Sequence, residues 1–275
     1  MDFAYHGGIY RDVWMIGKSS VAITDALEAD KVAGGGVFVH FDNISGKKAE
    51  VYVDTEVHNS GKRTRTVAVE TVLADAGDVP VKRISQQVKL QAGESKTVRQ
   101  QFAVRNPKLW SPDSPYLYRI QSRVKAGHEV LDGGVTRVGI RKAEFKGKDG
   151  FWLNGKPFGQ LVGANRHQDF AYVGNALPNS QQWRDAKRLR DAGCTIIRVA
   201  HYPQDPAFMD ACDEMGLFVI VATPGWQYWN KNPEFAKLVH RNTREMIRRD
   251  RNHPSVLMWE PILNETPYPR AFALE

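Results

Sequence analysis

The hydrophobic pattern of the chain changes its period near residue 142, and this change restricts the folds that are open to it. Between about residues 19 and 141, apolar and polar residues alternate with a period of two, which is typical of half-buried antiparallel strands. Seven such runs are separated by turn-forming residues, at 37–41, 51–57, 66–73, 81–90, 96–104, 117–125 and 129–140. We therefore expect an immunoglobulin-like β-sandwich over residues 19–141.

From residue 142 onward, short apolar strands alternate with amphipathic helices. An Asn154-Gly155 turn predicts a small hairpin at the start of this part. The expected strands are 160–164, 195–200, 218–223 and 256–260, and the expected helices start at Asn179 as N-cap, at Asp205-Pro206 and near Pro233. Repeated strand–helix units imply a parallel sheet, and four strands make half of a (β/α)8 barrel. We expect residues 142–275 to form the first half of a TIM barrel.

Composition excludes several classes of protein. The 275 residues are 42% hydrophobic and 25% charged, and they contain no run of about 20 apolar residues that could span a bilayer. The net charge of +7 comes partly from the basic helix at 233–250 and has no nucleic-acid motif beside it, so we expect neither a membrane nor a nucleic-acid partner. Cys194 and Cys212 have no zinc-type spacing. We expect free thiols, no metal site and no cofactor.

Polar and aromatic residues follow each predicted strand of the second part. They are Asn165, Arg166 and His167 after the first strand, Arg198 and His201 at the second, Trp226 and Trp229 after the third, and Asn264 and Glu265 after the fourth. The C-terminal ends of barrel strands share one rim, which is where such barrels hold their chemistry. Glu265 offers a carboxylate there. The indoles of Trp226 and Trp229 could stack on a sugar ring, and packing in the core or at the rim is the alternative for both.

Two long segments resemble the signatures of glycoside hydrolase family 2, the β-galactosidase, β-glucuronidase and β-mannosidase group. They are TIIRVAHYPQDPAFMDACDEMGLFVIV and RDRNHPSVLMWEPILNE. Shorter stretches, GGIYRDVWM, LWSPDSPYLY, VGIRK and GANRH, also resemble family elements. The first of these resembles the last strand of the family's sugar-binding jelly roll, so residues 1–18 are expected to be a remnant of that domain and a linker.

The resemblance implies a role for each matching residue. Glu265 matches the general acid/base, and Asn264 matches the residue that hydrogen-bonds the sugar 2-hydroxyl. Arg198 matches the signature arginine, whose planar fork is expected to orient a carboxylate. His201, His167 and Asn165 match residues near the sugar subsite, with a role in support of that subsite as the alternative for each histidine.

The chain also departs from the family pattern. Thr195 stands where the family usually has Asn, Gln168 stands where many β-galactosidases have Glu, and Glu260 stands where a small residue usually follows the strand-four tryptophan. The segment ATPGWQYWN replaces an acidic segment that supplies magnesium ligands in some β-galactosidases. These departures leave the sugar open.

Hydrolysis with retention of configuration needs two carboxyl groups about 5–5.5 Å apart. Glu260 and Asp169 are the other carboxylates near the rim, and the family pattern supplies the nucleophile from a later strand. We expect the chain to be an inactive fragment of a retaining exo-β-glycosidase that resembles β-galactosidases, with a β-linked glycoside as substrate. The alternatives are a non-catalytic carbohydrate-binding protein and a β-glucuronidase or β-mannosidase of the same family. The open half-barrel would favour self-association, and the cellular compartment stays open.

Overall fold

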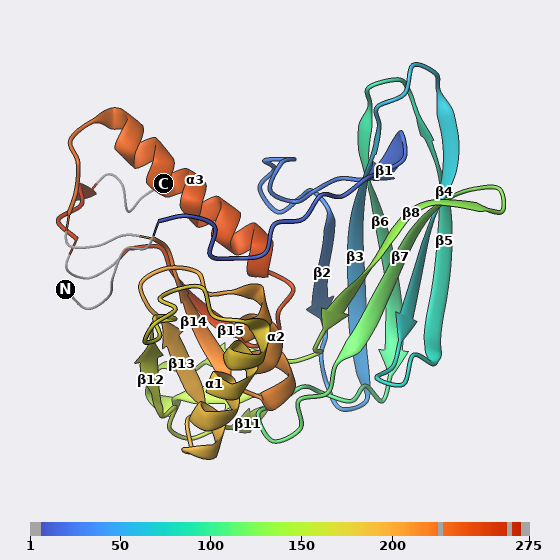
Figure 1. The fold of residues 1–275 in the computed structure, drawn as a ribbon. Helices are drawn as coiled ribbons and strands as arrows, with labels where there is room; N and C mark the ends of the chain where they lie inside the picture. Colours follow the sequence, from blue (N-terminus) through green and yellow to red (C-terminus); the bar gives the residue numbers. More distant parts are fainter. Residues whose placement is uncertain (1–6, 225–227, 263–265, 271–275) are drawn as a thin grey trace. The chain divides into compact units, whose positions relative to one another are not determined.

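A computed structural model describes residues 7–224, 228–262 and 266–270 (Figure 1). The chain divides into two compact units. One unit holds residues 15–160 and 251–254, and the other holds residues 1–14, 161–250 and 255–275. Each has a hydrophobic core of its own. Within the described ranges, every helix is too short or too polar to cross a lipid bilayer.

The first unit is built around two antiparallel sheets. One sheet contains β1 (Val21–Ile23), β2 (Val37–Asp42), β3 (Lys48–Asn59) and β6 (Ser95–Arg105), with β3 paired to the other three. The other has the order β5-β4-β7-β8, from Pro80–Leu90, Arg65–Ala74, Tyr118–Ala126 and Glu129–Val138. All seven strands expected from the period-two runs are therefore present, and β1 is an additional one.

In β6 the burial of the side chains follows the predicted period of two. Its burial alternates between exposed and buried residues, with Val98, Phe102 and Val104 turned into the two cores between the sheets. Gln100 is also turned inward, and its amide donates a hydrogen bond of 3.0 Å to the Val69 carbonyl on β4. Residues 19–141 contain no cysteine, so the two sheets are joined by apolar packing and by this polar contact.

A small three-stranded sheet follows the sandwich within the same unit. It consists of β9 (Ala143–Phe145), β10 (Phe151–Leu153) and β11 (Lys156–Pro157), with the short 3-10 helix η1 (Gly147–Asp149) between the first two. Asn154 and Gly155 connect β10 to β11 with φ angles of 53° and 79°. Two successive positive φ angles are the backbone that an Asn-Gly hairpin turn requires, so the predicted hairpin is confirmed.

The second unit holds a four-stranded parallel sheet in the order β12-β13-β14-β15. The strands are Gly163–Arg166, Ile196–Val199, Phe218–Ala222 and Val256–Glu260, and the helices between them are α1 (Asn179–Asp191), α2 (Pro206–Met215) and α3 (Pro233–Asp250). In Figure 1 this is the yellow-to-red part of the ribbon. The strand–helix alternation is as predicted. The sheet is open, so these residues make part of a barrel and not a closed one.

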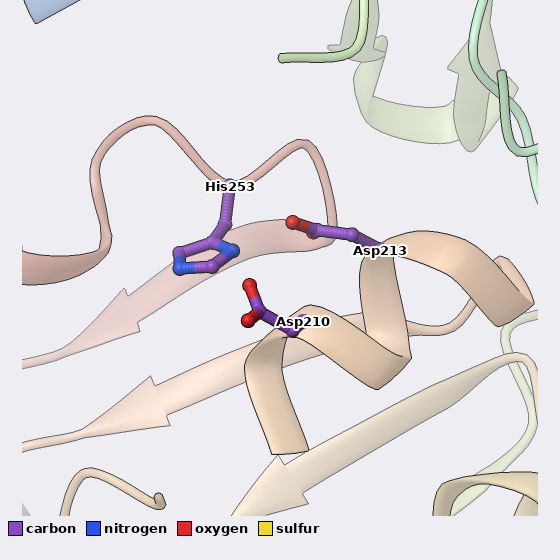
Figure 2. Close-up of side chains that lie close together, drawn as sticks. All are labelled: Asp210, Asp213 and His253. Atoms are coloured by element: carbon purple, nitrogen blue, oxygen red, sulfur yellow. The ribbon is translucent and has the colours of Figure 1, made fainter. Parts of the chain in front are cut away.

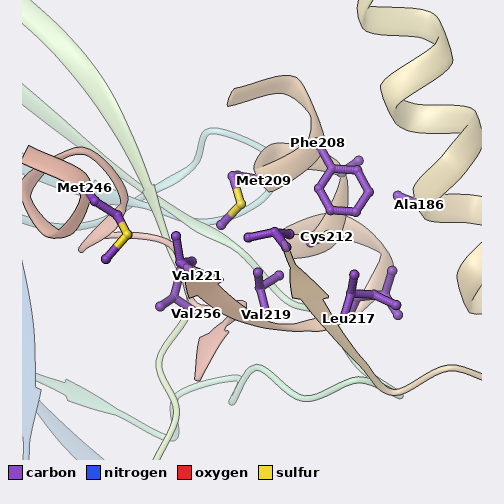
Figure 3. Close-up of a cluster of buried hydrophobic side chains, with 12 residues drawn as sticks. Ala186, Phe208, Met209, Cys212, Leu217, Val219, Val221, Met246 and Val256 are labelled. Atoms are coloured by element: carbon purple, nitrogen blue, oxygen red, sulfur yellow. The ribbon is translucent and has the colours of Figure 1, made fainter. Parts of the chain in front are cut away.

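One face of this sheet packs against the helices. Ile197, Val199, Val219 and Val221 form a core with side chains from all three helices, among them Phe208 (Figure 3). Successive residues of a strand point to opposite faces of the sheet. The strand residues next to these four therefore point away from the helices, to the face that lines the barrel interior. Arg198 and Glu260 belong to this inner set.

Several boundaries differ from the sequence prediction by one to three residues. The N-cap of α1 is Pro178 and not Asn179, because the Pro178 carbonyl already accepts hydrogen bonds from the amides of Gln181 and Gln182. Asp205 caps α2 as predicted: its carboxylate accepts a 2.9 Å hydrogen bond from the Ala207 amide.

The first parallel strand begins at Gly163, three residues later than predicted. A Cβ at this position would lie 1.7 Å from the Ile196 carbonyl oxygen, so only glycine allows β12 to approach β13 so closely. The residue before Gly163 is held by Thr195. The Thr195 hydroxyl accepts a 2.9 Å hydrogen bond from the Val162 amide and donates one of 3.2 Å to the Val162 carbonyl. The threonine that departs from the family pattern therefore fixes the start of β12.

Candidate active site

The strongest polar contact on the inner face of the parallel sheet joins Arg198 on β13 to Glu260 on β15. Arg198 Nε donates to Glu260 Oε2 at 2.6 Å, and Arg198 Nη2 donates to Glu260 Oε1. Two parallel N–H···O bonds give the pair both strength and a defined orientation. The sequence predicted that the Arg198 fork would hold a carboxylate, and in this structure the carboxylate is that of Glu260.

The strand register explains how the pair crosses β14. Arg198 lies opposite Ile220, and Glu260 lies opposite Ala222. Both charged side chains are partly accessible, at 23% for Arg198 and 19% for Glu260. Arg198 is the next-to-last residue of β13 and Glu260 is the last residue of β15, so the partly exposed pair lies near the C-terminal ends of its strands.

The two predicted histidines lie together at the same ends of the strands. His167 follows β12 and His201 follows β13, and their ring centroids are 5.4 Å apart with a 55° tilt. His201 is buried, and His167 is half-buried. Asn165, on the edge strand β12, is exposed and lies opposite Arg198 in the register. The structure thus brings Asn165, Arg198 and both histidines to neighbouring ends of two strands.

Polar contacts behind the histidines hold the two strand ends together. Gln168 Oε1 accepts a 3.0 Å hydrogen bond from the backbone amide of Asp205. The backbone amide of Gln168 donates a 3.2 Å hydrogen bond to the Tyr202 hydroxyl. Burial raises the pKa of Tyr202, so its phenol stays protonated near neutrality. Gln168, which replaces the glutamate of many β-galactosidases, is fully buried and positions this loop.

Arg166 does not belong to the rim, contrary to the sequence prediction. It is the last residue of β12, and its side chain points toward the helices, where it is buried. Its guanidinium donates to Gln204 Oε1 at 2.5 Å, to Gln182 Oε1 at 2.8 Å and to Asp185 Oδ2 at 2.7 Å. It also lies 4.0 Å from the centre of the Phe208 ring. The strand pleat sends Asn165 inward and Arg166 outward, so Arg166 holds α1 and α2 on the sheet.

The remaining predicted residues fall into two groups. Trp229 packs edge-on against Phe235 at the start of α3, with ring centroids 5.3 Å apart, which favours a packing role for it. Trp226, Asn264 and Glu265 lie outside the described residues. The described residues continue to Ile262, two residues beyond Glu260, the last residue of β15.

Asp210 and Asp213, both on α2, are carboxylates away from these strand ends (Figure 2). Asp213 is buried, and its carboxylate accepts a 3.0 Å hydrogen bond from the Ser255 amide, just before β15. His253 is also drawn in Figure 2 and belongs to residues 251–254, which cluster with the other unit. Asp213 therefore has a structural task, which is to join α2 to the start of the strand that carries Glu260.

The fold and this arrangement agree with a known family. Residues 144–274 match the model described as "Glycosyl hydrolases family 2, TIM barrel domain", and residues 36–141 match the model "Glycosyl hydrolases family 2". The chain belongs to glycoside hydrolase family 2. The family assignment made from the two signature segments is therefore confirmed.

The relatives of this family 2 chain carry two activities in their names. A β-galactosidase of Thermoanaerobacter pseudethanolicus is 35% identical over 97% of the chain and 34% of the relative. The β-galactosidase BoGH2A of Bacteroides ovatus is 32% identical over 92% of the chain and 29% of the relative. A crystal structure of a Bacteroides uniformis β-glucuronidase superposes with a TM-score of 0.86 and 31% identity, covering 94% of the chain and 31% of that structure. The chain spans about a third of the length of these proteins.

The pairing of Arg198 with Glu260 is the feature of these strand ends that was not predicted from the sequence. Glu260 was recognised as a departure from the family pattern, but its direction on the strand stayed open. The signal that would have found it is the register: the inner face of β13 carries Arg198, and Glu260 is the acidic residue on the inner face of β15.

Proposed function

We propose that the protein that contains this chain is a retaining β-glycosidase that releases a terminal β-linked sugar, with a β-galactoside as its substrate. Membership of family 2 supports the reaction class, and the relatives named β-galactosidase support the sugar. The observation that carries the proposal is the position of the second signature segment. This segment runs through β15, which shares one parallel sheet with the strands that carry or precede Asn165, Arg198 and His201, and in the sequence Glu265 follows the last residue of β15 by five positions.

In the proposed mechanism Glu265 has two successive tasks. It first donates a proton to the oxygen of the leaving group while a second carboxylate attacks the anomeric carbon and forms a covalent glycosyl–enzyme ester. It then takes a proton from water, which attacks the same carbon and releases the sugar with its configuration retained. Asn264 contributes a hydrogen bond to the sugar 2-hydroxyl that strengthens in the oxocarbenium-like transition state.

The attacking carboxylate in this proposal comes from a later strand of the family pattern. Glu260 is held in the fork of Arg198, and this binding favours a supporting task for it over that of a nucleophile. We therefore expect a polypeptide of residues 1–275 alone to be inactive. Release of p-nitrophenol from an aryl β-galactoside by that polypeptide, with loss of the activity in Glu265→Gln, would contradict this expectation.

A β-glucuronidase is the competing function, because a solved β-glucuronidase superposes closely on the chain. A panel of p-nitrophenyl β-galactoside, β-glucuronide and β-mannoside, offered to the product of the complete gene, decides between them. We expect the galactoside to be cleaved fastest and the first-formed sugar to be the β-anomer by proton NMR. Cleavage of none of the three, or release of the α-anomer, would refute the proposed reaction.

The same assay tests the role of Glu265. With these nitrophenyl substrates the leaving group needs little protonation, so Glu265→Gln should lower kcat through the water step, in which a general base contributes about 10²- to 10⁴-fold. Glu245→Gln, at a carboxylate on α3 that is 42% exposed, is the matched control and should leave the rate unchanged. Equal rates for both variants would remove Glu265 from the mechanism.

A further inference from the structure

Arg11 ties a segment from the beginning of the chain to the loop that carries His201. It lies 192 positions before Pro203 in the sequence, yet its Nη2 donates a 2.8 Å hydrogen bond to the Pro203 carbonyl oxygen. Residues 1–14 cluster with the parallel-sheet unit, so this contact is made within one compact unit. Arg11 belongs to the stretch GGIYRDVWM, which has no part in the proposed mechanism.

The loop of residues 200–205 connects β13 to α2 and is also held from the side of the sheet. The Tyr202 hydroxyl accepts a hydrogen bond from the backbone amide of Gln168, and the backbone amide of Asp205 donates to Gln168 Oε1. These two contacts fix one side chain and the far end of the loop. The contact from Arg11 instead holds the backbone in the middle of the loop, at Pro203.

The guanidinium of Arg11 is half-buried and has charged neighbours on both sides of it. Burial lowers its pKa, and the positive charge of Arg249 acts in the same direction, whereas the negative charge of Asp205 raises it. A guanidinium stays charged near neutrality all the same. A hydrogen bond from a charged donor that is partly withdrawn from water costs more to break than one at an open surface. The contact with Pro203 is therefore expected to persist in solution.

His201 is the residue of this loop that lies with His167 at the strand ends. Its imidazole is buried, and the centroids of the two rings are 5.4 Å apart. Pro203 follows His201 by two positions, so a displacement of the backbone at Pro203 also moves His201. Side chains of an active site must be held closely in place, because a misplacement of about 1 Å can slow catalysis by about 10²-fold.

We propose that Arg11 is a positioning residue: by holding the Pro203 carbonyl it fixes the loop of residues 200–205 and, through this loop, places His201 in the site. This inference rests on the proposed β-glycosidase function and deepens it, because it makes the segment of residues 7–12 a support of the active site. Arg11 acts through His201 and does not itself touch the substrate.

A double-mutant cycle on the product of the complete gene tests this path, with hydrolysis of p-nitrophenyl β-galactoside as the assay. Arg11→Ala should lower kcat/KM by about 10- to 100-fold. His201→Ala should lower it as well, and adding Arg11→Ala to that variant should cause little further loss, because the ring that Arg11 places is already gone. Arg184→Ala, at an exposed site on α1, is the matched control and should leave kcat/KM unchanged.

Chemical rescue gives a readout that a mere loss of stability would not give. A pocket of about 390 Å³ lies beside Arg11 and is lined in part by Tyr10, Pro178 and Asp205, so a small cation has room to reach the place of the missing side chain. Guanidinium chloride at millimolar concentration, far below what unfolds proteins, should restore part of the kcat/KM that Arg11→Ala loses. Tetramethylammonium chloride carries the same charge without an N–H donor and should restore nothing. Arg11→Lys, whose ammonium can donate to a carbonyl, should keep more activity than Arg11→Ala.

Hydrogen exchange in the same protein reports on the loop independently of catalysis. The backbone amides of Gln168 and Asp205, which both take part in the contacts of the loop, should exchange faster in Arg11→Ala, and those of β4 in the sandwich should not change. Wild-type kcat/KM in Arg11→Ala, a loss that multiplies with that of His201→Ala, or unchanged exchange at both amides would each overturn the inference. If the wild type hydrolyses no glycoside, the proposed function fails, and faster exchange at the two amides would still show that Arg11 holds the loop.

Discussion

Replacing Arg166 with methionine should destabilise the unit that contains the parallel sheet by about 3–5 kcal/mol. Methionine keeps the unbranched apolar stem and its contact with Phe208, but it removes all three hydrogen bonds from the guanidinium. Gln182 and Gln204 are fully buried, so their amide oxygens would lose a partner that water cannot easily replace.

The magnitude follows from these acceptors. Each buried amide oxygen that loses its partner costs about 1–3 kcal/mol. Asp185 contributes less, because 23% of its side chain is exposed and it can be hydrated in the variant. Two buried acceptors and a discounted ion pair therefore give a loss of about 4 kcal/mol. Arg166→Lys should lose about half as much, because one ammonium group cannot serve all three acceptors.

Urea denaturation of the chain measures this loss. Trp183 on α1 packs against the core of the same unit, so its fluorescence reports on the affected region. The matched control is Arg184→Met, one position along the helix at an exposed site, which should change the free energy of unfolding by less than about 0.5 kcal/mol. If Arg166→Met unfolds at the same urea concentration as this control, Arg166 does not hold the helices on the sheet and the reasoning is wrong.

Three further predictions follow from individual contacts. Gly163→Ala should weaken the β12–β13 pairing, because the new methyl group would collide with the Ile196 carbonyl; faster amide hydrogen exchange in β12 would show it, and unchanged protection would contradict it. Asp205→Ala should cost about 1 kcal/mol through loss of the α2 cap, measured by urea denaturation, and a variant as stable as the wild type would speak against that cap. Cys212 is buried, and burial raises its pKa well above the usual value, so the thiolate is scarce at pH 8. Iodoacetamide should therefore modify the half-buried Cys194 first in the folded chain, and mass spectrometry that finds Cys212 labelled first would refute this order.

Much of the fold could be predicted because period and turn chemistry are local signals. The alternation in β6 and the Asn154-Gly155 turn each dictate their structure within a few residues. The start of β12 could not be predicted in this way, because it depends on the absence of a side chain at Gly163 opposite the Ile196 carbonyl. That contact joins positions 33 residues apart in the chain and becomes visible only when the two strands are paired.

The candidate site also has a part that could be predicted from the sequence and a part that could not. The rim residues were predictable in kind, since Asn165, Arg198 and His201 follow or end strands whose C-terminal ends share one edge. The direction of each side chain was not predictable, because it depends on where the pleat begins. Because neighbouring residues of a strand point to opposite faces, Arg166 points to the helices and Asn165 points to the other face. The same alternation places Glu260 on the face of the sheet that carries Arg198.

The leaving-group dependence of the Glu265→Gln variant tests the central claim most directly. The departure of 2,4-dinitrophenolate needs no proton, whereas a methoxide leaving group needs one, so only the second reaction depends on a general acid. The value of kcat/KM reports the first chemical step. Measured on the product of the complete gene, Glu265→Gln should lower kcat/KM for methyl β-galactoside by about 10²- to 10⁴-fold and should leave that for 2,4-dinitrophenyl β-galactoside nearly unchanged. An equal loss with both substrates would show that Glu265 is not the acid that protonates the leaving oxygen.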